Sequence, residues 1–223
     1  MRVVSWNCNG AFRKKFNKIL SLDADIYVIQ ECENPDITLD ERYINFSDSY
    51  VWTGENKNKG LGIFSKNGIN FEEIYWPRHG LRNFISICIN SEFNLLGVWA
   101  CKPYIEEYYI YQNINYELID ENTIIIGDFN SNSIWDHQHG QRNHSIVVKE
   151  LEAKNLFSAY HYLKREEHGK ETEKTFYLHK HPDKAFHIDY CFLTPHRIAK
   201  FSILAQQDWL EYSDHMPIVV DIK

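Results

Sequence analysis

Residues 2–32, RVVSWNCNGAFRKKFNKILSLDADIYVIQEC, decide the fold that we predict for this chain. Residues 2–8 form an apolar run typical of a strand, and DIYVIQEC (25–32) is a second run of the buried-strand type. Between them, residues 11–21 place apolar side chains on one helical face and basic side chains on the opposite face. The pattern predicts a strand, a helix over 11–21 and a second strand, arranged as a β-α-β unit.

The rest of the chain alternates between strand-like and helix-like segments. Strands are expected at 50–54, 60–66, 69–76, 81–90, 93–102, 123–128, 186–194, 200–207 and 217–223, and helices at 105–120 and 144–155. No linker, repeat or low-complexity tract divides the sequence, so we expect a single domain over residues 1–223. A β-α-β opening followed by successive strands predicts an α/β fold in which sheets pack face to face with helices outside.

Composition and charge narrow the class of protein. With 43 % hydrophobic and 25 % charged residues, the 223-residue chain has the composition of a globular protein. It has neither an apolar run of about 18 residues nor a signal-like N-terminus, which predicts a cytoplasmic protein with no membrane contact. The net charge is −7, yet residues 1–20 hold five basic side chains and no acid. Five scattered cysteines without a CxxC pair indicate reduced thiols.

Polar side chains gather where the apolar runs end. They lie in SWNCNG (5–10), IQECE (29–33), GDFNSN (127–132) and SDHMP (213–217). An Asn or Asp after a strand is most often a turn former that bonds its own backbone. Glu31 differs, because a carboxylate near the end of an apolar strand must be exposed, paired or bound to a metal.

The dipeptide Asp214-His215 combines an acid with an imidazole directly before the last predicted strand. Successive residues of an extended segment point to opposite faces, so these two side chains are not expected to pair with each other. Asp189, which interrupts an apolar run, is a candidate partner for the imidazole. Its carboxylate either orients a catalytic histidine or bonds backbone amides, and the sequence leaves both alternatives open.

The residue types in these segments indicate a particular chemistry. Carboxylates, two amides and one histidine from strand ends suit a hard, oxygen-liganded cation such as Mg²⁺ better than tetrahedral zinc. The sequence contains no GxxxxGK[ST] loop, no GxSxG elbow and no HExxH helix. We therefore predict metal-assisted attack of water on a phosphate ester.

The ordered set SWNCNG, QE, GDFN, HIDYCF and SDHMPI resembles the motifs of the endonuclease/exonuclease/phosphatase superfamily. Members of this superfamily share the fold of pancreatic deoxyribonuclease and exonuclease III. The resemblance runs from Asn7 to Pro217. It implies a four-layered α/β sandwich of two mainly antiparallel sheets with helices outside, and cleavage of phosphoester bonds with Mg²⁺, or with Mn²⁺ as a substitute.

The resemblance also implies the residues of a metal site. Glu31 would be the principal carboxylate, with Asn7 beside it, and Asp214 would complete the set directly or through water. Many relatives carry a His or Tyr against the phosphate at the end of the strand that corresponds to residues 93–102. Here Lys102 and Tyr104 are both candidates for that position, and Lys102 would bring a positive charge to the substrate.

Four further residues receive catalytic roles from the same resemblance. Asp128 would orient or deprotonate the attacking water, and Asn130 would hold a phosphate oxygen. His215 would bond the scissile phosphate, with Asp189 on its far nitrogen. The division of roles between Asp128 and the His215–Asp189 pair stays open.

The loop after GDFN is rich in polar and basic side chains. Its residues His137, His139, Arg142 and His144 either contact phosphate or form a solvated loop. Trp135 in the same loop is the best candidate for stacking on a base.

We expect a nuclease that cleaves DNA phosphodiester bonds and that needs no obligate protein partner. The alternative is a phosphatase of the same fold that acts on a small-molecule or lipid phosphate. A binding protein on an inactive nuclease scaffold is a third hypothesis.

Overall fold

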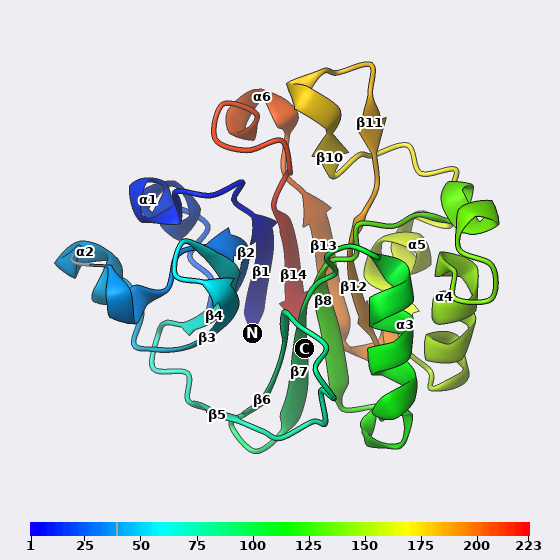
Figure 1. Cartoon of the computed structure of the whole chain (residues 1–223), viewed down its shortest axis with the longest axis horizontal. Helices are drawn as coiled ribbons and strands as arrows, with labels where there is room; N and C mark the ends of the chain where they lie inside the picture. The colour runs from blue at the N-terminus through cyan, green and yellow to red at the C-terminus, as the bar shows by residue number, and fades with distance from the viewer. Residues whose placement is uncertain (39) are drawn as a thin grey trace.

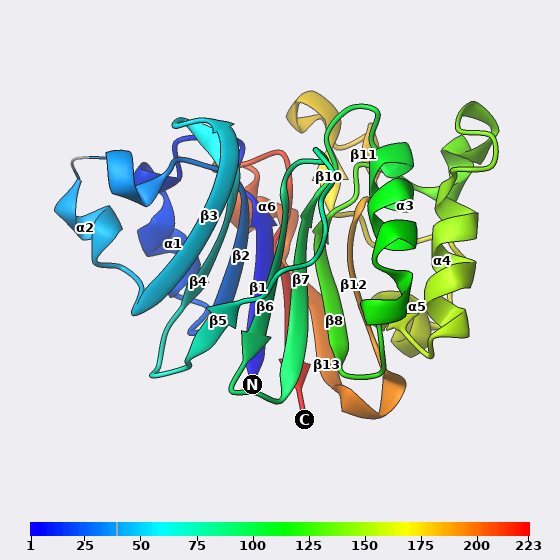
Figure 2. The same cartoon turned by 60° about the horizontal axis from the view of Figure 1, so that its bottom comes forward.

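Two six-stranded sheets pack face to face and helices cover their outer faces, which gives the molecule four layers (Figure 2). The structure is a computed structural model that describes residues 1–38 and 40–223. Each sheet is mainly antiparallel with one parallel strand pair. The predicted α/β sandwich is therefore confirmed.

The first sheet contains both ends of the chain. In the order in which they pair, its strands are β13 (Ile198–Ile203), β14 (Ile218–Ile222), β1 (Arg2–Asn7), β2 (Ile26–Cys32), β4 (Lys59–Ser65) and β3 (Ser49–Asn56). β1 runs parallel to β2 and antiparallel to β14. The N-terminal ammonium donates a hydrogen bond of 2.9 Å to the carbonyl oxygen of Ile222, so the termini lie side by side (Figure 1).

The second sheet carries the middle of the sequence. Its strands are, in pairing order, β5 (Phe71–Glu73), β6 (Phe84–Ile89), β7 (Phe93–Trp99), β8 (Thr123–Asp128), β12 (Asp189–Leu193) and β9 (Phe157–Ser158). β7 and β8 are parallel, and β12 runs antiparallel to β8. A separate two-stranded ribbon of β10 (Phe176–Tyr177) and β11 (Ala185–Phe186) lies near the upper edge in Figure 1.

In the part of the chain that the structure describes, six α-helices and six 3₁₀ helices connect the strands. The α-helices are α1 (Phe16–Leu20), α2 (Glu41–Ile44), α3 (Ile105–Ile114), α4 (His144–Ala153), α5 (Ala159–Lys164) and α6 (Gln206–Trp209). The 3₁₀ helices are Phe12–Lys14, Pro35–Ile37, Tyr116–Leu118, Ser133–Gln138, Leu178–Lys180 and Pro195–Arg197. α1 and α2 flank the first sheet, and α3, α4 and α5 flank the second (Figure 2). Within the described residues, no helix has the length and apolar character needed to cross a bilayer.

The apolar strands of the centre have two buried faces, which explains their composition. Side chains alternate along a strand, so Val3 packs with Ile126 between the sheets, whereas Val4 and Trp6 pack with Phe12 in the outer layer. Since neither face meets water, the strand reads as a continuous apolar run. The carboxylates Glu31 and Asp128 accordingly lie where these strands end, at the edge of the sheets.

Each expected strand overlaps an observed strand, but the segment 186–194 is divided between β11 and β12, and residues 206 and 207 of the segment 200–207 lie in α6. Several helices also depart from the expectation. The segment 11–21 is not one helix, because a 3₁₀ turn ends at Lys14 and α1 begins only at Phe16. Lys15 between them has a φ of −120° and donates from Nζ to the carbonyl oxygen of Cys8 at 2.6 Å. This bond draws the chain toward the end of β1 and interrupts the helix. α5 lies outside the predicted helices.

A close approach of β7 to β8 constrains Gly127. A Cβ on this residue, whose φ is +153°, would lie 1.9 Å from the carbonyl oxygen of Val98. We expect Gly127→Ala to lower the free energy of unfolding by about 3 kcal/mol or more, because backbone must move to admit the methyl group. Gly140→Ala is the matched control, since its Cβ at a φ of +52° would meet nothing within 4 Å. Urea unfolding measures both, and equal losses would contradict this account.

Candidate active site

The polar residues singled out in the sequence meet where strands of both sheets end. Asn7 is the last residue of β1, and Asp128 is the last residue of β8. Asp189 begins β12 and lies directly opposite Asp128 in the strand register. His215 joins them from the segment before β14, through an isolated bridge to Phe176 of β10. The site therefore spans the two sheets at a single edge of the sandwich.

The side-chain amide of Asn7 connects the two sheets inside the site. Its Nδ2 lies 3.0 Å from Oδ2 of Asp128, to which it donates, and 3.4 Å from Oε1 of Glu31. Its Oδ1 accepts from the backbone N–H of Asn9 at 3.0 Å, which fixes the orientation of the amide. A carboxylate from each sheet thus faces the same side chain.

Glu31 adopts a backbone conformation that turns its side chain out of the apolar strand. Its φ is +64°, and the pairing of β2 with β4 is irregular between Gln30 and Cys32, the two residues that flank it. A left-handed conformation costs a residue with a Cβ roughly 1 kcal/mol, and such conformations cluster at functional sites. Oε2 of the half-buried Glu31 carboxylate lies 2.9 Å from Nζ of Lys59. Of the three alternatives for this carboxylate, the structure shows a paired one.

His215 is buried and held on both sides of its ring. Its Nδ1 lies 3.0 Å from Oδ2 of Asp189, and its Nε2 lies 4.0 Å from Oδ2 of Asp128. Its backbone N–H donates to Oγ of Ser213 at 3.0 Å, and that hydroxyl donates to the carbonyl oxygen of Asn7 at 2.7 Å. The carboxylate of Asp189 faces the imidazole of His215. The backbone N–H of Asp189 donates to Oγ1 of Thr175.

The two ends of this constellation differ in their proton affinity. Burial raises the pKa of Asp128 to about 7, with the charge of Asp189 adding to the effect and that of His215 opposing it. Burial lowers the pKa of His215, but the carboxylates of Asp189 and Asp128 raise it to a net value of about 9. The site thus combines an imidazolium with a carboxyl group that exchanges its proton near neutral pH.

The donor set fits a divalent cation with oxygen ligands. One ligand atom each from Asp128, Asp189 and His215 lies within 4.8 Å of the others, and the Asn7 amide extends this group to Glu31. Carboxylate and amide oxygens are the ligands that Mg²⁺ and related hard cations take in proteins.

Asp214, the third residue of the predicted metal set, lies further from this group. Its half-buried side chain has Oδ1 3.5 Å from the hydroxyl of Ser213. The side chains of Asp214 and His215 do not bond each other within the described residues, in keeping with the alternation of an extended segment.

Asn130 is held by hydrogen bonds, whereas Lys102 and Tyr104, the two candidates for a phosphate contact after β7, are exposed. The side chain of Asn130 donates to Oδ2 of Asp128 at 2.9 Å and to the carbonyl oxygen of Ala100 at 3.2 Å. Lys102 and Tyr104 are both exposed in the loop that follows β7. They can reach a bound substrate without first breaking a buried contact.

A small cavity beside Glu31 contains residues that the sequence motifs did not indicate. It has a volume of about 110 Å³ and is lined by Glu55, Asn56, Lys59, Arg82, Asn83, Trp99 and Cys101. Lys59 lies on one side of it, with Nζ 5.6 Å from the centre of the Trp99 ring. Lys59 begins β4 of the first sheet and Arg82 lies in the segment before β6 of the second sheet, so only the tertiary structure brings these cations to the same place.

The loop after GDFN separates into exposed and buried parts. His137 and Arg142 are exposed, and Nδ1 of His139 lies 3.0 Å from Oε1 of Glu106. Trp135 is half-buried against Phe186, with ring centres 5.0 Å apart. His144 is fully buried at the first residue of α4, so both alternatives given for it, phosphate contact and a solvated loop, are wrong. The helical face that contains His144 turns it toward Tyr190.

The sequence and the fold agree with one family of known proteins. Residues 4–215 match the model of the endonuclease/exonuclease/phosphatase family, and the chain belongs to this family. The fold and the site thereby define a phosphoester hydrolase. No curated protein matches the sequence.

Solved structures with this fold include bacterial and archaeal enzymes. An AP endonuclease from Archaeoglobus fulgidus is 16 % identical with a TM-score of 0.73, and the match covers 100 % of this chain and 99 % of that one. A 3′-5′ exonuclease (NExo) from Neisseria meningitidis is 14 % identical with a TM-score of 0.72 over 100 % of both chains. A 3′ phosphatase NExo from Neisseria, bound to a product DNA hairpin, is 16 % identical with a TM-score of 0.71 over 100 % and 99 %. At these identities the likeness shows the fold.

The strained backbone of Glu31 allows its role to be separated from stability. We expect Glu31→Gly to leave the free energy of unfolding within about 1 kcal/mol of the wild type, because glycine adopts a positive φ without penalty. Hydrolysis of a phosphoester should nevertheless fall by at least about 100-fold, since a principal charge of the site is lost. Glu31→Gln is the matched control. It keeps the Cβ and therefore the penalty for a positive φ, and it should lose activity to the same extent. A strongly destabilised Glu31→Gly would show that the carboxylate is structural.

Proposed function

We propose that this protein is a Mg²⁺-dependent hydrolase of DNA phosphodiester bonds, with Mn²⁺ able to replace Mg²⁺. The observation that carries the proposal is the continuous buried constellation of Asn7, Asp128, Asp189 and His215 at one edge of the two sheets. Burying several carboxylates together costs folding free energy unless they are paired or bind a cation. A site that binds a metal and a phosphate accounts for the cluster.

The proposed metal ligands are Glu31, Asn7 and Asp214. When bound there, a divalent cation would supply Lewis-acid stabilisation of the charge that develops on the phosphate. Lys59, which pairs with Glu31, adds a positive charge at the same edge of the site. Binding of substrate and metal would compete with this partly exposed ion pair, whose own contribution to stability is small.

Asp128 and His215 would act on different atoms, Asp128 on the attacking water and His215 on a phosphate oxygen. With a pKa raised by burial to about 7, Asp128 can accept a proton from the attacking water and release it again near neutral pH. Nε2 of His215 is aimed at the site because Asp189 holds Nδ1, so the imidazolium can donate to a phosphate oxygen. The Asn130 amide, which donates to Asp128 and to the carbonyl oxygen of Ala100, would exchange one of these two hydrogen bonds for a bond to another phosphate oxygen.

DNA is the proposed substrate because of the relatives and of the cations around the site. The similar structures include an AP endonuclease, an exonuclease and a 3′ phosphatase bound to a DNA hairpin. Lys59 and Arg82 are exposed at the cavity beside Glu31, and Lys102 is exposed in the loop after β7, despite the net charge of −7. A phosphatase that acts on a small-molecule or lipid phosphate would use the same chemistry, so the substrate has to be decided by experiment.

Asp128→Asn is the first test of the proposed chemistry. We expect at least about 100-fold slower nicking of supercoiled plasmid in Mg²⁺, because a general base typically contributes 10²–10⁴-fold. Thermal unfolding should change little, since the substitution replaces a desolvated acid by an amide of the same shape. Asp183→Asn, an exposed carboxylate, is the control and should keep full activity. Nicking by Asp128→Asn at the wild-type rate would exclude the proposed role.

The salt dependence of hydrolysis separates DNA from a small phosphate as substrate. Contacts to the DNA backbone release counterions, so the KM for plasmid should rise steeply with salt concentration. Lys102→Ala should reduce the slope of log affinity against log salt by about 1 if this side chain contacts one phosphate. Faster hydrolysis of a small phosphomonoester than of plasmid or a 3′-phosphorylated hairpin, with no salt dependence, would favour the phosphatase.

A further inference from the structure

A second cluster of polar side chains lies on the outer face of the second sheet, around Tyr190 of β12. His161 comes from α5, and His168 and Glu171 come from the segment that follows this helix. The rings of His161 and His168 have centres 6.1 and 5.9 Å from the ring of Tyr190. Neither histidine belongs to the phosphoester site, and no sequence motif predicted the cluster.

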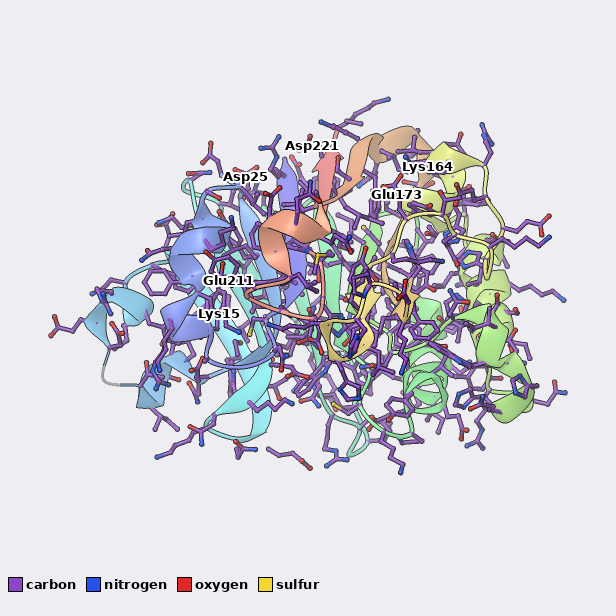
Figure 3. All side chains as sticks on the ribbon, turned by 90° about the horizontal axis from the view of Figure 1, so that it is seen from above. Lys15, Asp25, Lys164, Glu173, Glu211 and Asp221 are labelled. Carbon is purple, nitrogen blue, oxygen red and sulfur yellow. The ribbon has the colours of Figure 1, made fainter. Side chains whose placement is uncertain are left out.

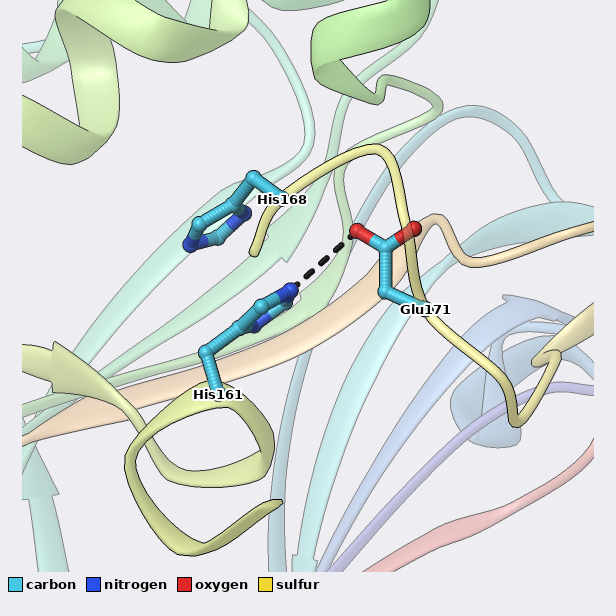
Figure 4. A group of neighbouring side chains, drawn as sticks. All are labelled: His161, His168 and Glu171. Atoms are coloured by element: carbon cyan, nitrogen blue, oxygen red, sulfur yellow. Dashed lines mark hydrogen bonds and ion pairs between the residues drawn. The ribbon is translucent and has the colours of Figure 1, made fainter. Parts of the chain in front are cut away.

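The three side chains are arranged with their ligand atoms together. Nε2 of His161 lies 3.1 Å from Oε1 of Glu171, and the ring of His168 stacks on that of His161 with centres 3.5 Å apart (Figure 4). One ligand atom from each residue lies within 4.8 Å of the other two. Ligands of a tetrahedral zinc ion are separated by roughly 3.3–3.5 Å, given metal–ligand bonds of about 2.0–2.2 Å. The His161–Glu171 pair already has about this separation.

A second set of contacts holds these rings in place. Nδ1 of His161 lies 2.8 Å from Oγ of Ser158, and Nδ1 of His168 lies 3.1 Å from Nε2 of the fully buried His144. Metal-binding histidines are commonly oriented in this way, through the ring nitrogen on the other side or a neighbouring polar group. Nδ1 of His144 is also buried, and it has no hydrogen-bond partner among the described residues. A buried polar atom beside this cluster is therefore left unsatisfied by the protein.

Glu171 places a negative charge in this cluster without a permanent positive partner. Its side chain is 2 % exposed, and Oε1 accepts from Nδ2 of Asn132 at 3.0 Å and from the N–H of Gly169 at 2.8 Å. Among the residues that the structure describes, no lysine or arginine forms an ion pair with this carboxylate.

We propose that His161, His168 and Glu171 bind a transition-metal ion of the zinc class at a structural site separate from the phosphoester site. Two imidazoles and one carboxylate favour Zn²⁺ or Co²⁺ over Mg²⁺, which prefers oxygen ligands. A divalent ion balances the charge of Glu171, and it would enter past His168, which is half-buried, because the side chain of His161 is only 8 % exposed.

This metal site would fasten the segment after α5 to the catalytic strands. The same segment is attached to α5 by the Lys164–Glu173 ion pair, whose partners lie together in Figure 3. Its Thr175 accepts hydrogen bonds from the backbone N–H groups of Ile188 and Asp189. A bound ion would therefore stiffen the backbone that positions Asp189, without contact to the substrate.

Co²⁺ binding to the full chain tests the proposal. The protein is stripped with EDTA, desalted and titrated with Co²⁺ while its visible absorption is recorded, and Zn²⁺ or Mg²⁺ is then added. We expect one Co²⁺ per chain with the ligand-field bands of a four-coordinate site, displaced by Zn²⁺ and not by Mg²⁺. His161→Ala and Glu171→Gln should lose the bands, with affinity reduced by at least about 100-fold.

Matched controls separate this site from exposed histidines and from the phosphoester site. The double variant His179→Ala/His181→Ala removes two exposed histidines and should keep the bands, as should Glu31→Gln. If His161→Ala does not fold, His168→Gln at the half-buried ring serves instead, with loss of the Zn²⁺-dependent rise in Tm as the readout. Absence of the bands in the wild type, their persistence in the cluster variants or their loss in Glu31→Gln would overturn the proposal.

Discussion

The buried carboxylate of Asp128 is the constraint on which the rest of the site depends. It is fully inaccessible to water, so its oxygens must find donors inside the protein. Asn7 supplies one from the other sheet, Asn130 supplies two from the following turn, and the His215 ring stands 4.0 Å away. Because these donors come from three separate parts of the chain, the carboxylate is satisfied only when both sheets are packed and the last strand is in place.

The segments around this carboxylate adopt conformations that an optimally stable protein would avoid. Glu31 and Asn130 both have positive φ angles, and Gly127 passes so close to β7 that no other residue fits. Each deviation turns a side chain or a backbone group toward the site and is maintained by the apolar strands on both sides. The stability of the two-sheet core thus allows a polar, strained edge, where we propose that the phosphoester is hydrolysed.

Much of the fold could be predicted because it depends on local patterns. Buried strands appear as apolar runs, and their ends appear as polar segments, so the strands and the neighbourhood of Asn7, Glu31 and Asp128 follow from reading along the chain. The helix over 11–21 failed because a contact of Lys15 with the carbonyl oxygen of Cys8 overrides helical periodicity. The assignment of His144 to a surface loop failed because its burial depends on Tyr190, which is distant in the sequence.

The sequence by itself determined the fold class, the family resemblance and the residue types of the phosphoester site, since motif order and apolar periodicity are properties of the chain. Only the tertiary structure decided which groups meet: Lys59 with Glu31, Asp189 with His215, and His161 with Glu171. It also decided the charge states, because burial raises the pKa of Asp128 and the neighbouring carboxylates raise the pKa of His215, both above their values in solution. The physical reason is that desolvation and Coulomb interactions depend on distance in space, which a linear sequence does not encode directly.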